Sequence, residues 1–281
     1  DALPIYSYAL IVVHWGVVQT EWYAPGWDRQ RLTQSQSMMK TLAALALGAA
    51  VAEGYITSVE EPVSTYLPEW AGDPRGAIRI VDLLQMASGL AQARFTLNPF
   101  ASDSAFRVLN SSDRAPVYLR TPLTGATGKT FDYNDLNAAL VGLIVQRATG
   151  RPFAEWLDTR IWRPMGGQPA AVWLDREGEG ATAMTACCML AAAMDWARVG
   201  LLMKDRGMVR GNAVLPAAWI DAMITPSPAF AGYGYFTWLG PDLGSTQLRP
   251  GDRERPQSEP LLTPRWTWRV AFRGRFCHHD Q

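Results

Sequence analysis

A serine and a lysine at the start of a predicted helix are the residues of this chain best suited to nucleophilic chemistry. Ser37 and Lys40 precede the apolar run Thr41–Leu47 directly, and residues three apart share one face of a helix. The serine then lies among free N–H groups at the positive end of the helix dipole. The pattern predicts an acyl-enzyme site, in which the hydroxyl attacks, the amine takes its proton and backbone N–H groups hold the oxyanion.

This serine–lysine pair is the only one with its spacing in the chain. The other two lysines, Lys129 and Lys204, follow an alanine and a leucine at that distance. A competing interpretation is a surface helix on which Ser37 is only the N-cap. The three histidines are too few and too poorly placed for a Ser-His-Asp triad. The proton acceptor must therefore be another group, which favours Lys40.

Composition limits the class of protein. The chain has 281 residues, of which 48% are hydrophobic, enough for one large domain or for one domain with an insertion. Because 26 basic residues balance 26 acidic ones, there is no electrostatic reason to expect nucleic acid or an anionic membrane as a partner. No apolar run approaches the ~20 residues that span a bilayer. The chain starts at Asp1 without a visible signal peptide, so an export signal was removed or never existed, and the compartment stays undetermined.

Cysteine usage indicates neither a disulfide framework nor a zinc site. The three cysteines are Cys187, Cys188 and Cys277, an odd number with two adjacent. We expect a chain that does not depend on oxidation, in which the adjacent pair packs near the site as small buried residues. No cluster of histidine, cysteine and carboxylate has ligand spacing, so we expect neither a metal nor a cofactor.

Hydrophobic patterning predicts strands at both ends of the chain and helices between them. A hairpin is expected over residues 5–22 with its turn at 14–16, and further strands at 233–239 and 266–276. The helix that carries Ser37 should end near Glu53, before Gly54. Other helices are predicted at 81–90, 136–149, 153–161, in the second half of 183–202, and at 216–223, with short helices and loops over 91–122.

Several stretches resemble the serine β-lactamase-related hydrolases. That group includes class C β-lactamases, D-alanyl-D-alanine carboxypeptidases, family VIII carboxylesterases and 6-aminohexanoate-dimer hydrolases. The stretches occur in the family's order: Ser37–Lys40, Glu61–Pro68, Leu83–Leu90, Phe131–Asp135, Gly150–Phe153 with Arg163–Gly166, and Ala193–Gly200. The adjacent cysteines stand where such relatives commonly have Gly-Gly.

The resemblance implies an α+β, β-lactamase/transpeptidase-like fold. An antiparallel sheet flanked by helices would come from residues 1–55 and 181–281, and a mainly helical region from residues 56–180. The active-site groove would lie between these two parts.

The resemblance assigns Tyr133 to the family's second motif, Tyr-x-Asn, beside Lys40 and the serine hydroxyl. There it would act as general base in acylation and activate water in deacylation. A free lysine amine is largely protonated at neutral pH, so Lys40 can act as the base only if burial or another cation shifts it. The choice between Lys40 and Tyr133 stays open. Alternatively, Tyr133 is a core residue at a helix entrance.

The third position of that motif is Asp135 and not asparagine. A carboxylate there favours protonated Lys40 and opposes its use as a base. Either Asn134 or Asn137 could supply the missing carboxamide. Asp135 could equally be a helix N-cap.

The family's third motif, Lys-Thr-Gly, is absent, and the only candidate is Phe272-Arg273-Gly274. Arg273 could bind a substrate carboxylate, and an N–H near Gly274 could complete the oxyanion hole with that of Ser37. A basic edge strand is the alternative. Only seven residues follow Gly274, where the family has further strands, so we expect a chain that is truncated or ends in a different reading frame.

The sequence therefore predicts a serine hydrolase that cleaves a small ester or amide through an acyl-enzyme, as a carboxylesterase or amidase. The first alternative is a β-lactamase or D-Ala-D-Ala carboxypeptidase, which the altered second and third motifs disfavour. The second is an inactive or truncated member that acts as a binding protein. A small molecule is the expected partner, and the sequence does not define the oligomeric state.

Overall fold

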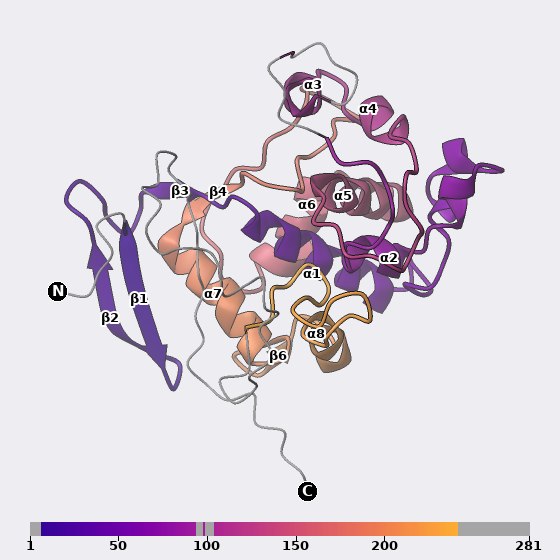
Figure 1. The fold of residues 1–281 in the computed structure, drawn as a ribbon. Helices are drawn as coiled ribbons and strands as arrows, with labels where there is room; N and C mark the ends of the chain where they lie inside the picture. The colour runs from indigo at the N-terminus through magenta and orange to yellow at the C-terminus, as the bar shows by residue number, and fades with distance from the viewer. Residues whose placement is uncertain (1–6, 94–97, 99–103, 241–281) are drawn as a thin grey trace, which may run out of the picture.

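Helix α1, Met38–Ala52, runs through the middle of the part of the chain that the computed structural model describes, residues 7–93, 98 and 104–240 (Figure 1). Its residues from Thr41 to Ala50 are almost all leucine or alanine, and most are inaccessible to solvent. A helix that is apolar on every side must be surrounded by other elements. The helix ends at Glu53, and Gly54 follows with φ 79°, as predicted.

Two tryptophans donate hydrogen bonds to carbonyls in the body of α1. Trp156 Nε1 lies 2.9 Å from Ala46 O, and Trp219 Nε1 lies 3.1 Å from Ala44 O. Gly48 allows the second indole to approach, because a Cβ atom there would come within 2.2 Å of Trp219 Nε1. Indole N–H groups that are buried need an acceptor, and α1 supplies it in both cases.

Helices α5 and α6 and the π-helix pack against α1. Helix α5 contacts α1, α2, α4 and α6, and Gly150 with φ 65° closes it, as predicted. The helices are α2 Ile80–Leu84, α3 Ala105–Asn110, α4 Ala115–Leu119, α5 Asp135–Thr149, α6 Phe153–Leu157, α7 Ala193–Lys204 and α8 Ala217–Met223. Short 3₁₀ helices cover Val63–Thr65, Pro68–Trp70 and Pro74–Ala77, and a π-helix covers Asp158–Trp162.

The described strands form antiparallel pairs. Strands β1, Ala9–His14, and β2, Val17–Tyr23, make the predicted hairpin, although His14 ends the first strand and is not a turn residue. Trp15 and Gly16 both have positive φ, at 52° and 75°, as a tight hairpin turn requires. Helix α7 packs against β1, beside the hairpin in Figure 1.

Two shorter strand pairs complete the described sheets. Strand β3, Leu32–Gln34, pairs with β4, Leu190–Ala192, and β5, Met208–Val209, pairs with β6, Asn212–Ala213. The β3–β4 pair matters for the site, because it brings the residues before Ser37 against those after Cys188. Helices together with antiparallel strands give the predicted α+β class.

Three predicted elements differ from the structure. The helix expected over 81–90 covers only Ile80–Leu84, because Met86 has φ 56° and leaves the helical conformation. Residues 233–239 form no strand, and only an isolated bridge joins Tyr233 to Trp238. The segment turns because Phe236 has φ 45°, which takes the chain out of an extended conformation. The predicted helix over 153–161 changes into a π-helix at Asp158. The strand expected at 266–276 lies outside the described residues. Among those that are described, no helix is both long and apolar enough to cross a membrane.

Candidate active site

Ser37 is the N-cap of α1 and is exposed to solvent. The residue before it, Gln36, has φ 48°, a left-handed conformation that costs a non-glycine residue roughly 1–3 kcal/mol. Ser35 N donates to Met189 O over 2.8 Å, which ties this turn to the neighbouring segment. Within the described part of the chain, no acceptor pairs with the Ser37 N–H, so it can receive an oxyanion.

Lys40 is buried, with 1% of its side chain exposed, yet its ammonium group has three acceptors. Lys40 Nζ lies 3.0 Å from Ser37 Oγ, 2.7 Å from Ala186 O and 2.7 Å from Asp135 Oδ1. An ammonium has three N–H donors, and each one finds a partner here. This arrangement suits a positively charged lysine, because a buried cation is tolerated only when it is paired and hydrogen-bonded.

Tyr133 lies next to this lysine. Its ring centroid is 5.0 Å from Lys40 Nζ, and its carbonyl accepts from Gln92 Nε2 over 2.7 Å. The Tyr133 hydroxyl makes no hydrogen bond to a described residue, and the side chain is half-buried. The Tyr133 ring therefore lies beside the same ammonium group that contacts the Ser37 hydroxyl.

Asp135 is the first residue of α5 and contacts Lys40, with 67% of its own side chain exposed. A carboxylate at a helix N-terminus is favourable because it meets the positive end of the dipole. Asp135 is not the N-cap, as one interpretation of the sequence had it, because Asn134 occupies that position.

Neither neighbouring asparagine contacts Lys40. Asn134 Oδ1 accepts from Leu136 N and its amide donates to Leu90 O, each over 3.0 Å. The buried Asn137 accepts from Ser88 Oγ over 2.6 Å. Both side chains therefore stabilise the entrance of α5, and the carboxylate of Asp135 is what faces the lysine.

An aromatic cluster that the sequence interpretation missed surrounds Tyr133. Trp238 has its ring centroid 5.4 Å from that of Tyr133 and 4.9 Å from that of Tyr233, and 59% of its side chain is exposed. Phe131 and Phe230 complete the cluster. Burial, aided by the charges of Tyr133 and Asp135, raises the pKa of Tyr233 well above its usual value, so that phenol stays neutral. The residue pattern around 236 favours a strand, so it did not predict that the chain would bend there and bring these rings together.

The adjacent cysteines form a disulfide beside the site, which corrects the expectation of unpaired cysteines. Both residues are half-buried. Cys188 has φ 80°, and its N–H donates to Gln36 O over 3.3 Å. Cys277 lies outside the described residues, as do Arg273 and Gly274, so the predicted carboxylate-binding and second oxyanion groups stay predictions.

A second buried cation lies at the N-terminus of α4, and no pattern in the sequence predicted it. Arg114 is 4% exposed; its backbone N–H donates to Asp175 Oδ2 over 2.8 Å and its Nη2 to Leu109 O over 3.1 Å. Its Nε and Nη1 find no partner in the described structure. Burial raises the pKa of nearby Tyr118, which the charge of Arg114 opposes and that of Asp135 reinforces.

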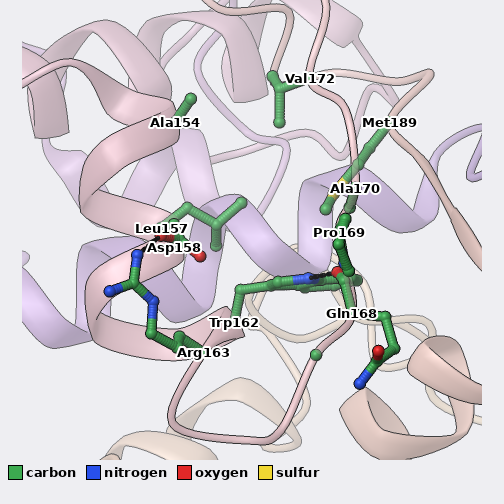
Figure 2. Close-up of a pocket in the computed structure, with 11 residues that line it drawn as sticks. Ala154, Leu157, Asp158, Trp162, Arg163, Gln168, Pro169, Ala170, Val172 and Met189 are labelled. Atoms are coloured by element: carbon green, nitrogen blue, oxygen red, sulfur yellow. Dashed lines mark hydrogen bonds and ion pairs between the residues drawn. The ribbon is translucent and has the colours of Figure 1, made fainter.

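A pocket of about 350 Å³ opens between the π-helix and the segment that follows it (Figure 2). The indole of Trp162, the pair Asp158 and Arg163, and Met189 are among its lining residues. None of the predicted site residues lines it. A further pocket of about 400 Å³ includes Phe131 and Asp132, directly before Tyr133. The described residues hold no group of three or more histidine, cysteine or acidic side chains that could bind a metal ion.

Fold and site together define a protein of the serine β-lactamase and transpeptidase type. Residues 4–266 match the Beta-lactamase family, and the chain belongs to it. The structure of a penicillin-binding protein from Bacillus halodurans superposes with a TM-score of 0.64 at 17% identity, covering 82% of this chain and 79% of that one. This likeness shows the shared fold.

Two curated relatives carry the names of amide-cleaving enzymes. The 6-aminohexanoate-dimer hydrolase of Paenarthrobacter ureafaciens is 27% identical over 225 residues, which cover 77% of this chain and 56% of that protein. The N-acetylmuramyl-L-alanine amidase of Bacillus subtilis is 30% identical over 127 residues, 43% of this chain and 28% of the relative. The chain thus spans about half the length of the first and less of the second.

Proposed function

We propose that this protein is a serine hydrolase that forms an acyl-enzyme on Ser37 with a small ester or amide. One observation carries the proposal: the buried ammonium of Lys40 lies 3.0 Å from the exposed hydroxyl of Ser37 and within 5.0 Å of the Tyr133 ring. A nucleophile and a neighbouring cation at a helix N-terminus, with a phenol beside that cation, are the parts that acyl transfer needs.

Tyr133, rather than Lys40, is the general base in this proposal. Each of the three donors of Lys40 already has an acceptor, one of them the carboxylate of Asp135, so the lysine is held as a cation. Its positive charge stabilises the phenolate form of Tyr133, which is the form that can accept a proton. The Tyr133 oxygen takes the proton of Ser37 as the hydroxyl attacks, and returns it to the leaving group as the tetrahedral intermediate collapses.

Deacylation repeats these roles with water. Tyr133 accepts a proton from water, the resulting hydroxide attacks the ester bond to Ser37, and the proton goes to the serine oxygen as the acid leaves. The Ser37 N–H, at the positive end of α1, stabilises the oxyanion in both halves of the reaction.

The names of the two curated relatives favour an amide substrate. The aromatic cluster of Phe131, Tyr133, Phe230, Tyr233 and Trp238 adjoins Lys40 through Tyr133, and it favours an apolar acyl or leaving group. We therefore expect turnover of short-chain esters and of anilides with an apolar acyl chain.

The test is hydrolysis of a p-nitrophenyl ester and of the matching p-nitroanilide by purified protein. The variant is Ser37→Ala, and the control is Ser112→Ala, which changes an exposed serine with no side-chain hydrogen bond. We expect Ser37→Ala to lose at least about 10³-fold in rate and Ser112→Ala to keep its activity. Circular dichroism checks that all proteins are folded.

Equal rates in wild type and Ser37→Ala would contradict the assignment of the nucleophile. A folded wild type that neither turns over these substrates nor reacts with a serine-directed phosphonate would indicate an inactive family member that only binds ligands. Faster hydrolysis of a chromogenic cephalosporin than of either substrate would move the protein to the β-lactamase alternative.

A further inference from the structure

The disulfide between Cys187 and Cys188 lies at the point where the chain holds the catalytic lysine. The preceding residue, Ala186, accepts from Lys40 Nζ over 2.7 Å, the joint shortest of the three contacts of that ammonium. The direction of the Ala186 carbonyl therefore helps to fix where the positive charge sits. The two cysteines follow it immediately.

The same short segment also holds the turn before the nucleophile. Cys188 N donates to Gln36 O over 3.3 Å, and Met189 O accepts from Ser35 N over 2.8 Å. Residues 186, 188 and 189 thus contact Lys40, Gln36 and Ser35 in turn. A change in the backbone between 186 and 189 would move both partners of the Ser37–Lys40 hydrogen bond.

The disulfide restrains the backbone at the position where it is least favourable. Cys188 has φ 80°, a left-handed conformation that is unfavourable for a residue with a Cβ atom unless its surroundings hold it there. A bond between adjacent side chains closes a small ring that includes the peptide linking them, so it limits rotation at that peptide. Glycine would adopt this φ without any restraint.

We propose that the Cys187–Cys188 disulfide is a positioning element of the active site, so that a dithiol reductant acts on this bond and lowers the rate of acyl transfer by Ser37. One thiolate of the reductant attacks a cysteine sulfur, the S–S bond breaks and a mixed disulfide forms. The second thiol of the reductant then displaces the other cysteine. The products are the thiols of Cys187 and Cys188 and the oxidised, cyclic reductant, which has given up two electrons and two protons.

The consequence for catalysis follows from the three contacts. Without the ring, Cys188 relaxes toward negative φ, and the Gln36 and Ala186 contacts lengthen or break. The ammonium of Lys40 and the hydroxyl of Ser37 are both still present, but they no longer have the relative positions that their hydrogen bond requires. Misplacement of this kind lowers kcat, because the geometry of the reacting groups changes, while substrate binding in the aromatic part of the groove continues.

The experiment uses the full chain in a Cys277→Ser background, so that the adjacent pair holds the only thiols. The oxidised protein is compared with protein reduced by dithiothreitol and alkylated at both cysteines, checked by peptide mass. We expect kcat for the p-nitrophenyl ester to fall by about 10- to 100-fold, with KM changing by less than about twofold. If the protein is reduced but not alkylated, kcat should fall in the same way. Reoxidation of that sample by an oxidised dithiol should then restore the original kcat.

Two double variants separate the ring from the sulfur atoms. Cys187→Ser with Cys188→Gly places glycine at the positive φ, and its rate should not respond to dithiothreitol. Cys187→Ser with Cys188→Ser keeps a Cβ atom there without a ring, and it should have the low kcat of the reduced protein under all conditions. If the second double variant fails to fold, the reduced wild-type pair and the glycine variant still decide the question.

The kinetic measurements rest on the proposed hydrolase function. Hydrogen exchange gives a second readout that does not depend on that function. Reduction should speed exchange in peptides that cover 34–41 and 184–191, and leave that of α5 unchanged. Equal exchange and equal kcat in the two redox states would overturn the positioning role. If neither state hydrolyses any substrate, the hydrolase proposal fails, and the exchange result alone decides whether the disulfide holds the Ser37 turn.

Discussion

Lys40 and Arg114 are both buried cations, but they differ in how many of their N–H donors have a hydrogen-bond acceptor. Lys40 is 1% exposed and has an acceptor for each donor, including a carboxylate. Arg114 is 4% exposed, and its Nε and Nη1 have no partner among residues 7–93, 98 and 104–240. One site is built to hold a charge, and the other only encloses one.

The difference shows which observation identifies a functional cation. Burial alone does not, because Arg114 is almost as buried as Lys40. Each unsatisfied buried donor costs about 1–3 kcal/mol, whereas a complete set of acceptors keeps a charge in place where a reaction can use it. Lys40 also contacts Ser37, the proposed nucleophile, whereas the side chain of Arg114 contacts, among the described residues, only the carbonyl of Leu109.

The largest expected effect comes from removing the satisfied cation. Lys40→Met should lower kcat by at least about 10³-fold, because the charge that stabilises the oxygen of Tyr133 and orients Ser37 is lost. Lys204→Met, the same change at an exposed lysine that pairs with Asp205, should keep full activity. Steady-state kinetics on both variants makes the measurement. If the kcat of Lys40→Met lies within tenfold of that of wild type, Lys40 is not a functional cation, and its complete set of acceptors has only a structural role.

Replacing the unsatisfied cation, Arg114, should improve a property of the protein, namely its stability. Arg114→Met keeps the backbone hydrogen bond to Asp175 and the aliphatic packing while it deletes the two unpaired donors. We expect the free energy of unfolding to rise by about 1 kcal/mol, measured by urea denaturation. A loss of stability above that size would show that the guanidinium is satisfied in solution, and the two cations would then be alike.

Asp135→Asn sharpens the comparison by removing charge from the Lys40 site and keeping an acceptor. The carboxylate offsets the positive potential of Lys40 at Tyr133 and Ser37. Without it, kcat should rise by about fivefold, which corresponds to about 1 kcal/mol for a charge pair in a solvated groove. The ester assay detects this change. A fall in kcat would mean that the carboxylate positions Lys40 and does more than screen it.

The smallest effect is expected at a charge pair on the surface, the opposite extreme from both cations. Hydrogen bonds from Arg75 lower the pKa of Asp73 to about 2. Because the folded value lies below the unfolded one near ~3.9, the stabilisation is present above pH 4 and disappears as the pH falls through 2. The Tm of Asp73→Asn should lie slightly below that of wild type at pH 7, and the difference should be clearly smaller at pH 2, where half of the folded protein has a protonated Asp73. A constant Tm difference at both pH values would contradict this account.

The sequence predicted those elements whose pattern is strong and whose ends are marked. The hairpin, α1 and α5 fall close to the expected bounds, because Gly16, Gly54 and Gly150 stop or turn the chain with positive φ. The segment at 233–239 looked like a strand since it is rich in aromatic residues. Only the backbone shows that it bends at Phe236 and brings Trp238 against Tyr133.

For the candidate site, spacing predicted that Lys40 would lie beside Ser37, and the resemblance predicted that it would lie beside Tyr133. They could not predict the carbonyl of Ala186, because any residue has a carbonyl and this one lies 146 positions from Lys40. They also could not indicate the disulfide, since adjacency favours no particular pairing. Contacts made by the backbone carry no signature in the side chains.

The two tryptophans that bond to α1 have a consequence for the nucleophile. A helix of leucine and alanine is nearly a smooth cylinder, so packing alone would tolerate small rotations about its axis or slips along it. Ala44 and Ala46 lie about 200° apart around that axis, so Trp219 and Trp156 hold the helix from opposite sides. The two hydrogen bonds oppose rotation and sliding of α1. The orientation of Ser37 is therefore fixed by contacts about two helical turns away from it.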